Sequence, residues 1–261
     1  MRAEQAITGL ILTYNEEPNI ERTLSQLTWL PRIVVVDSHS TDRTPEIADE
    51  FENTEIIKHP FVSHTKQWNF GLKETGIKTE WVLALDADYY LPEAVSKELR
   101  ERIDQQNDVA AYWLHFDYAI RGRVIRSGIY PPVQVLYRRE EAEYLSDGHT
   151  QRVTVKGESK HLKNRAIHDD RKPFSRWLQS QVHYAKLEAE KISSTPATKL
   201  ERNDRLRKRS KLTPFFIFIY CILWRSGWKD GQHGWLYAFE RLMAEIILQY
   251  QLTKLKIEKT E

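Results

Sequence analysis

The chain has 261 residues, 41% of them hydrophobic, which is enough to bury one substantial core with a small appendage. Basic and acidic residues nearly balance at a formal net charge of +2, so the composition argues against a nucleic-acid-binding protein and leaves room only for a local basic patch. The single cysteine, Cys221, excludes an intramolecular disulfide and a cysteine-based zinc cluster and favours a reducing compartment, with the cytoplasm as the default.

The first ninety residues alternate between short apolar runs and segments with helical spacing. The first run lies within Met1–Leu12, which has no small-residue cleavage site, so we expect a strand there and no secretion signal. The runs are Ile7–Leu12, Ile33–Val36, Glu55–Ile57 and Trp81–Leu85. This alternation predicts an α/β fold with a mostly parallel, Rossmann-like sheet flanked by helices.

Two helices are expected between these strands. The first is announced by Asn15 and Pro18 and continues to Leu27. The second starts after Ser40 or Thr41, either of which could cap it.

The segment from Ala110 to Ile167 changes to shorter strand-like pieces separated by charged and glycine-bearing loops. The pieces are Ala110–Phe116, Val133–Tyr137, Arg152–Val155 and Arg165–Ile167. A helix is predicted to follow over Pro173–Ser193, where apolar residues recur at helical spacing.

The C-terminal quarter joins a basic cluster to an apolar run. Lys199–Lys211 holds seven basic residues, and the apolar stretch Phe215–Trp224 is about half the length of a membrane-spanning helix. The pattern predicts a helical hairpin that lies on an anionic membrane surface, with Trp224, Trp228 and Trp235 at the interface. The alternative is a hairpin packed on the protein's own core or on a second subunit.

Polar side chains follow three of the predicted parallel strands. They are Thr13–Glu16, Asp37–Ser40 and the pair Asp86 and Asp88. Ligands of open parallel sheets bind at the carboxyl ends of the strands, so these residues form the first candidate site. Because no glycine-rich phosphate loop is present, a divalent cation, Mg²⁺ or Mn²⁺, is expected at Asp86 and Asp88. Taken alone, an Asp-x-Asp pair is also common in solvated turns.

Four segments in the same order resemble the family 2 inverting glycosyltransferases with a GT-A fold. They are Leu12–Glu17, Val35–Thr44, Gln67–Asn69 and Leu85–Asp88. The whole chain, including the Gly227–Gly231 turn, is similar to the branch that contains the lipopolysaccharide core β-glucosyltransferases.

The resemblance implies roles for these residues in binding a nucleotide-sugar donor. Thr13, Tyr14 and Glu16 would line the nucleoside pocket, and Asp37 would accept a hydrogen bond from the base. Asp86 and Asp88 would position the ribose, the diphosphate and the metal. Gln67 and Asn69 would contact the donor, although ordinary surface polarity of a helix explains them equally well.

The catalytic base is less clearly marked. Relatives often present His followed by Glu in the acceptor region, where this chain reads Ser146–Gln151. Asp147 is the nearest substitute, and His149 could assist or orient it. The alternative is that Asp147 and Gly148 form a tight turn between strands.

A second candidate segment lies further along the chain. His168 resembles the late histidine that often completes the metal site of GT-A enzymes. Asp169 and Asp170 are further candidates for the base, or they are acids at the start of the next helix.

These inferences predict a glycosyltransferase that moves a sugar, with UDP-hexose as the expected donor, onto a hydroxyl of a lipid-linked, lipopolysaccharide or polysaccharide acceptor. It would work in the cytoplasm, peripherally on the inner face of the cell membrane. We expect a catalytic domain over 1–195, with a donor half (1–106) and an acceptor half (107–195), and a basic, apolar extension over 196–261. The alternatives are a nucleotidyltransferase that acts on sugar phosphates and a non-catalytic membrane-surface scaffold.

Overall fold

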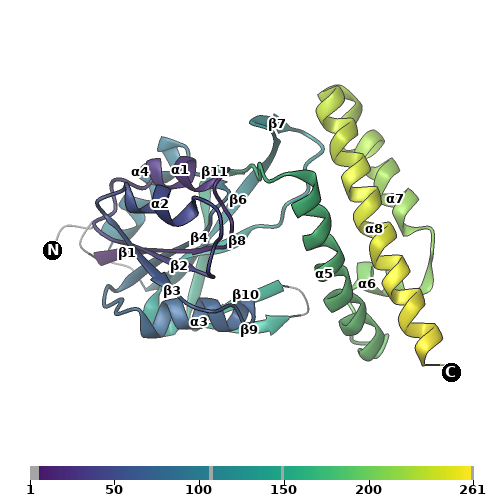
Figure 1. Ribbon diagram of the computed structural model, residues 1–261, viewed down its shortest axis with the longest axis horizontal. Helices are drawn as coiled ribbons and strands as arrows, with labels where there is room; N and C mark the ends of the chain where they lie inside the picture. Colours follow the sequence, from purple (N-terminus) through teal and green to yellow (C-terminus); the bar gives the residue numbers. More distant parts are fainter. Residues whose placement is uncertain (1–5, 106–107, 148–149, 260–261) are drawn as a thin grey trace. The chain divides into compact units, whose positions relative to one another are not determined.

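The computed structural model describes residues 6–105, 108–147 and 150–259 (Figure 1). The chain divides into two compact units. The first comprises Met1–Gly122, Tyr130–Ser146 and Gln151–Arg171, and the second comprises Arg123–Ile129, Asp147–Thr150 and Lys172–Glu261.

The first unit is built on one twisted sheet with the strand order β3-β2-β1-β4-β8-β6-β11-β5. Strands β1 to β4 pair in parallel, β8 is antiparallel to β4 and β6, and β11 is parallel to β6. The strands are β1 (Ile7–Thr13), β2 (Ile33–Asp37), β3 (Thr54–Lys58), β4 (Trp81–Asp86), β5 (Tyr89–Tyr90), β6 (Val109–Ile120), β8 (Val133–Arg138) and β11 (Glu158–His168). A separate ribbon pairs β9 (Ala142–Asp147) with β10 (Thr150–Val155). Every predicted strand is therefore present.

Helices cover both faces of this sheet. Helices α1 (Ile20–Ser25), α2 (Thr44–Asp49) and α4 (Glu93–Asp104) pack on one face, and α3 (His64–Glu74) packs on the other (Figure 1). Because β1, β2 and β4 are covered on both sides, their sequences are nearly continuous apolar runs. Gly71 lets α3 approach the sheet, since a Cβ there would lie 2.7 Å from Cδ1 of Leu10.

The second helix starts after Ser40 and Thr41 as expected, but the predicted cap is wrong. Helix α2 begins at Thr44, and neither Ser40 nor Thr41 caps it. Instead, the Thr44 N–H donates to Oδ1 of Asp42 at 3.0 Å. Ser40 is engaged elsewhere, because its hydroxyl donates to Asp37.

Helix α4 was not predicted, and its Glu98 joins it to β11. Both carboxylate oxygens of Glu98 accept hydrogen bonds from Lys163 and Asn164, and Arg102 pairs with it at 3.1 Å. Burial raises the pKa of Glu98, but these donors outweigh burial, so the pKa lies below its ordinary value of 4.5. The ionised carboxylate therefore stabilises the folded chain.

We expect Glu98→Gln to lower the free energy of unfolding at pH 7 by about 2 kcal/mol, because one strong acceptor of charge-assisted hydrogen bonds is lost. A carboxyl with a depressed folded-state pKa contributes stability above its unfolded pKa and loses it as the pH falls through the folded pKa. The difference between wild type and variant in urea unfolding should therefore shrink below about pH 4.5. An unchanged difference at acid pH would contradict this account.

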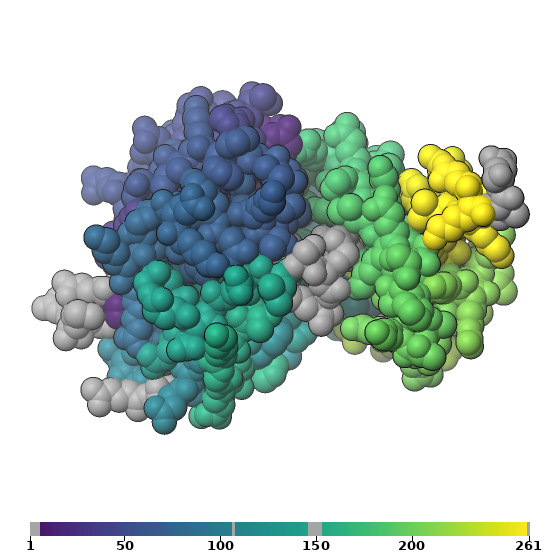
Figure 2. All heavy atoms as spheres, turned by 90° about the horizontal axis from the view of Figure 1, so that it is seen from below, coloured from purple at the N-terminus to yellow at the C-terminus, as the bar shows by residue number. Residues whose placement is uncertain are grey.

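The second unit is mainly helical. Its elements are the short strand β7 (Arg123–Ile125), α5 (Phe174–Ser194), α6 (Arg202–Arg209), α7 (Thr213–Ile219), the π-helical turn η3 (Tyr220–Trp224), the 3₁₀ turn η4 (Gly227–Asp230) and α8 (Gln232–Glu258). Helix α8 packs along both α5 and α7. In Figure 2 the yellow end of α8 lies against the green α5 region, where Leu248 packs with Ala189 and Ile192.

Polar anchors hold this helical unit together. Arg207 of α6 pairs with Glu245 of α8 and with Asp204. Buried Asp230 accepts hydrogen bonds from the backbone N–H groups of Arg126 and Ser127. Helix α5, placed in the catalytic domain from sequence, clusters with this unit. Within the described parts of the chain, no helix has both the length and the apolar character needed to cross a bilayer.

Candidate functional site

The carboxyl ends of β1, β2 and β4 meet at one edge of the first unit. Thr13 lies opposite Asp37, and Leu12 lies opposite Asp86, in the parallel register. The Thr13 hydroxyl donates to Oδ2 of Asp37 at 2.9 Å. The three predicted strand-end motifs are therefore neighbours in space.

Asp37 organises the loops at this edge. It is 1% exposed, and its carboxylate accepts from the Ser40 backbone N–H at 2.9 Å as well as from the hydroxyls of Thr13 and Ser40. Tyr14 is exposed and Glu16 is half-buried on the neighbouring loop. Asp37 does not cap α2, which starts at Thr44. Its contact with a base stays a prediction.

Gln67 and Asn69 lie on α3 as expected, but both amides are engaged within the protein. Gln67 is 1% exposed and bonds to the Ser38 hydroxyl and to His59, so surface polarity is the wrong explanation for it. Asn69 exchanges two hydrogen bonds with the backbone of Tyr144. Both residues therefore hold the surrounding loops, and their contact with a donor stays a prediction.

The structure brings His168 next to Asp88. His168 ends β11, and its Nε2 lies 3.3 Å from Oδ2 of Asp88. Burial lowers the pKa of His168, but the carboxylates of Asp88, Asp170 and Asp86 together raise the pKa above its usual value. Negative charge therefore gathers around this imidazole.

The donor set at this pair fits a divalent cation. Carboxylate oxygens with one imidazole are ligands that Mn²⁺ accepts, and Nδ1 of His168 is buried without a hydrogen-bond partner among the described residues. Within the same described ranges, no three His, Cys, Asp or Glu side chains are gathered at ligand spacing. Two protein ligands are enough when substrate phosphates and water complete the coordination.

Asp169 does not suit the role of base that its sequence position suggested. It is 2% exposed, and its Oδ2 accepts from Arg22 at 2.6 Å and from Arg171 at 2.8 Å. Its Oδ1 accepts from the Gly122 backbone N–H at 3.0 Å. Both oxygens are thus occupied, which gives Asp169 a structural role. The start of α5 at Phe174 also excludes Asp169 from the first turn of that helix.

The structure describes the other candidates for the catalytic base and its assistant to different extents. Asp170 is half-buried, and its Oδ1 accepts from Asn19 at 3.0 Å. Asp147 is the last residue of β9, so its place in a turn between strands stays open, and its side chain is outside the described part of the chain. His149 lies outside the described residues.

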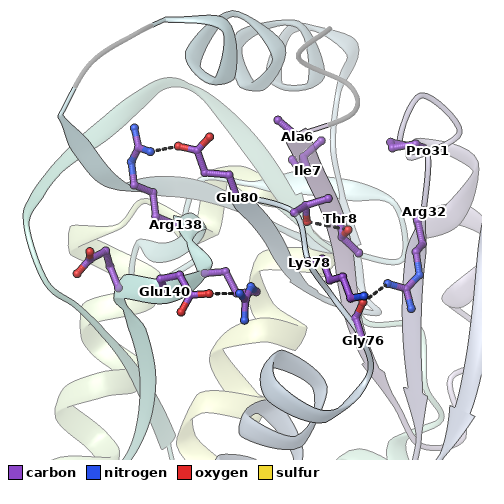
Figure 3. A pocket seen from close by; sticks show the side chains of 13 residues that line it. Ala6, Ile7, Thr8, Pro31, Arg32, Gly76, Lys78, Glu80, Arg138 and Glu140 are labelled. Carbon is purple, nitrogen blue, oxygen red and sulfur yellow. Dashed lines mark hydrogen bonds and ion pairs between the residues drawn. The ribbon is translucent and has the colours of Figure 1, made fainter. Parts of the chain in front are cut away.

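A cavity of about 840 Å³ lies at the opposite edge of the sheet, near the start of β1 and β4 (Figure 3). Three arginines line it, and each already pairs with a carboxylate: Arg32 with Glu55, Arg138 with Glu80, and Arg139 with Glu140. It lies away from the carboxyl ends where ligands of parallel sheets bind. We therefore place the candidate site at the Asp88–His168 edge.

Comparison with known proteins gives the family of the chain. Residues 10–155, more than half of the chain, match the model of "Glycosyl transferase family 2". The chain belongs to glycosyl transferase family 2. The matched residues include every strand-end motif of the site, whereas His168 and Asp170 lie beyond them.

Two curated relatives are similar to part of this chain. An uncharacterized glycosyltransferase of Rickettsia bellii is 36% identical over 99 residues, which cover 38% of this chain and 31% of that protein. One from Rickettsia typhi is 29% identical over 151 residues, covering 55% and 49%. The chain thus matches from about a third to a half of the length of these relatives.

Two solved structures share the fold. One is TarS residues 1–349 of S. aureus in complex with UDP, with a TM-score of 0.52, 15% identity, and coverage of 98% of this chain and 92% of that one. The other is the mannosyltransferase PcManGT of Pyrobaculum calidifontis in complex with GDP-Man and Mn²⁺, with a TM-score of 0.52, 14% identity, and coverage of 97% and 86%. Both support the α/β architecture expected for a GT-A fold.

Proposed function

We propose that this family 2 member transfers a sugar from a nucleotide-sugar donor, a UDP-hexose, to a hydroxyl group with inversion. The acceptor is a lipid-linked glycan, lipopolysaccharide or polysaccharide, as in the lipopolysaccharide core β-glucosyltransferase branch. One observation carries the proposal: Asp88 and His168 lie 3.3 Å apart beside the polar ends of β1 and β2. The complexes of TarS with UDP and of PcManGT with GDP-Man and Mn²⁺ support the donor class.

Asp88 and His168 would hold Mg²⁺ or Mn²⁺, with Asp86 beside them. When bound, the cation supplies positive charge that stabilises the departing diphosphate. Thr13, Tyr14, Glu16 and Asp37 form the loops that receive the nucleoside.

A carboxylate must take the proton from the acceptor hydroxyl. At the same time the hydroxyl oxygen bonds to the anomeric carbon, and the bond from that carbon to the diphosphate breaks. We assign this proton to Asp147, assisted or oriented by His149, with Asp170 as the alternative base. Asp169 suits this role less well, because it is buried and its carboxylate accepts hydrogen bonds from Arg22, Arg171 and Gly122.

The experiment that tests the reaction is incubation with a panel of nucleotide sugars, with Mn²⁺ and with EDTA. Released nucleoside diphosphate, dependent on metal, is the expected product, and thermal shift identifies the donor because a ligand of the folded state raises its stability. Release of pyrophosphate from a nucleoside triphosphate and a sugar phosphate would show a nucleotidyltransferase. Donor binding without turnover would show a scaffold.

We also propose that the second unit attaches the enzyme to the inner, cytoplasmic face of the cell membrane. The α7–η3 segment carries an exposed apolar face whose members recur at alternating spacings of three and one: Leu212, Phe215, Phe216, Ile219, Tyr220, Leu223 and Trp224. Trp224, at 72% exposed, is the most accessible of them. Phe218 packs instead against Trp235 and Phe239, which joins this face to exposed residues of α8.

The net positive charge of the second part of the chain supports an anionic bilayer as the partner of this exposed apolar face. Residues 172–261 contain 17 basic and 9 acidic residues, a net charge of +8, whereas residues 1–171 contain 22 and 28, a net charge of −6. Three of the seven basic residues in Lys199–Lys211 are used internally, namely Arg205, Arg207 and Lys208. The exposed cations Lys199, Arg202, Arg209 and Lys211 remain.

We expect the 261-residue chain to float with anionic liposomes at low salt. Electrostatic attraction of about 1 kcal/mol per basic residue is screened by salt, but burial of aromatic side chains is not, so high salt should weaken binding without abolishing it. Replacing Phe215, Phe216 and Trp224 by serine should leave only a salt-sensitive remnant.

The control is Phe61→Ser, which removes an exposed phenylalanine from the first unit. Protein that stays in solution with the liposomes would contradict the proposal. If light scattering then showed a dimer that the serine variant lacks, the exposed apolar face would be a subunit interface instead.

A further inference from the structure

The start of α1 carries a polar face that lies outside the sequence motifs. Arg22 and Thr23 lie three and four residues after Asn19, the residue that precedes α1, so both side chains share the side of the helix on which Asn19 lies. Asn19 and Thr23 are each 1% exposed, and buried polar groups of this kind need partners inside the protein.

Thr23 holds the loop that contains Asp88. Its Oγ1 lies 2.6 Å from the carbonyl oxygen of Ala87 and 2.9 Å from that of Tyr89. The two carbonyls share the single hydroxyl proton. Because they flank Asp88 in sequence, this hydroxyl fixes the backbone on both sides of the carboxylate.

Arg22 and Asn19 hold the segment that follows His168. Arg22 donates to the carboxylate and to the carbonyl of Asp169, each at 2.6 Å. The Asn19 amide donates to Asp170 and accepts from the Arg171 backbone N–H, each at 3.0 Å. Side chains on one side of α1 thus form hydrogen bonds with the chain next to Asp88 and next to His168.

A backbone hydrogen bond also joins the loop that contains Asp88 to the segment that follows His168. The Asp169 backbone N–H donates to the carbonyl oxygen of Asp88 at 3.1 Å. His168 itself lies opposite Tyr89 where β11 meets β5. The spacing of Asp88 and His168 is therefore set by this bond and by the strand pairing, together with the contacts that α1 makes on both sides.

We propose that Asn19, Arg22 and Thr23 are positioning residues that set the spacing of Asp88 and His168 and so prepare this pair for a divalent cation. This inference rests on the proposed function, because it takes Asp88 and His168 as the cation ligands. Metal sites tolerate only small errors in ligand distance, and groups that orient the ligands are part of their affinity.

The test measures Mn²⁺ binding to the 261-residue chain without donor. The electron paramagnetic resonance signal of free Mn²⁺ reports how much of the metal remains unbound. Thr23→Val keeps the shape of the side chain but removes the hydroxyl, and we expect Mn²⁺ affinity to fall about tenfold or more. Thr23→Ser restores the hydroxyl and should bind Mn²⁺ nearly as wild type does.

Thr79→Val is the matched control. The Thr79 hydroxyl bonds to Thr8 and to the carbonyl oxygen of Trp81 at the opposite end of β4, so its loss removes similar bonds away from the site. Its Mn²⁺ affinity should equal that of wild type.

Unchanged Mn²⁺ affinity in folded Thr23→Val would overturn the inference while leaving the proposed function standing. Wild-type protein that binds no Mn²⁺, either alone or with a nucleoside diphosphate, would instead overturn the metal site itself. If Thr23→Val does not fold, Arg22→Lys takes its place, because a lysine keeps the charge but cannot reproduce the planar fork that spans Asp169. It should also lose about tenfold in affinity, and wild-type binding by this variant would overturn the inference.

Discussion

Asp88→Ala should reduce sugar transfer by about a thousandfold or more, because the cation contributes several kcal/mol to stabilising the transition state and each 1.36 kcal/mol is a factor of ten in rate. The substitution removes a carboxylate at an edge of the sheet rather than a core side chain, so the fold should persist. Initial rates of transfer with saturating Mn²⁺, together with circular dichroism, measure both effects.

Asp49→Ala is the matched control, since it removes an exposed carboxylate at the end of α2. It should leave the rate unchanged. Near-normal turnover by Asp88→Ala with an unaltered metal requirement would show that the site lies elsewhere.

Asp147→Asn is expected to lower the transfer rate by about a hundred- to ten-thousandfold, the usual contribution of a general base. Donor affinity should change little, because the proton is removed only in the transition state. Single-turnover rates and donor binding, measured on the same preparation, separate these two quantities.

Glu143→Gln provides the control on the same strand, since Glu143 is exposed and pairs only at the surface with Lys73. An active Asp147→Asn with an inactive Asp170→Asn would move the base to the segment after β11. Asp169→Asn answers a different question, because it disturbs the bonds to Arg22 and Arg171 and should lower stability as well as rate.

The arrangement of the site could be predicted where it depends on strand order. The apolar runs of β1, β2 and β4 identify buried parallel strands, and parallel strands bring their carboxyl ends to one edge. The sequence therefore predicts that Thr13, Asp37 and Asp86 lie together. The family model covers the same residues.

The roles of single polar residues could not be predicted in this way. Asp169 was a candidate base because an acid beside His168 suits that role, but its partner Arg22 is 147 residues away in sequence. Gln67 is polar and helical, and only its packing against Ser38 and His59 shows that it is buried. Local pattern does not encode such long-range hydrogen bonds.

The basic cluster Lys199–Lys211 shows that sequence pattern also does not reveal which charged side chains pair within the protein. Seven cations in Lys199–Lys211 suggest a uniform electrostatic surface, yet Arg207 is held between Asp204 and Glu245. Counting charges along the sequence therefore overestimates the attraction to lipid.

The acidity of the site has a consequence for how its ligands bind. Asp86, Asp88 and Asp170 all act on His168, and this edge belongs to the part of the chain with a net charge of −6. A nucleoside diphosphate is itself an anion, so the bare site opposes it. Cation and donor should then bind as a thermodynamically linked pair, in which each strengthens the other by the same factor. Occupancy by the sugar nucleotide would consequently follow the free concentration of divalent metal in the cell.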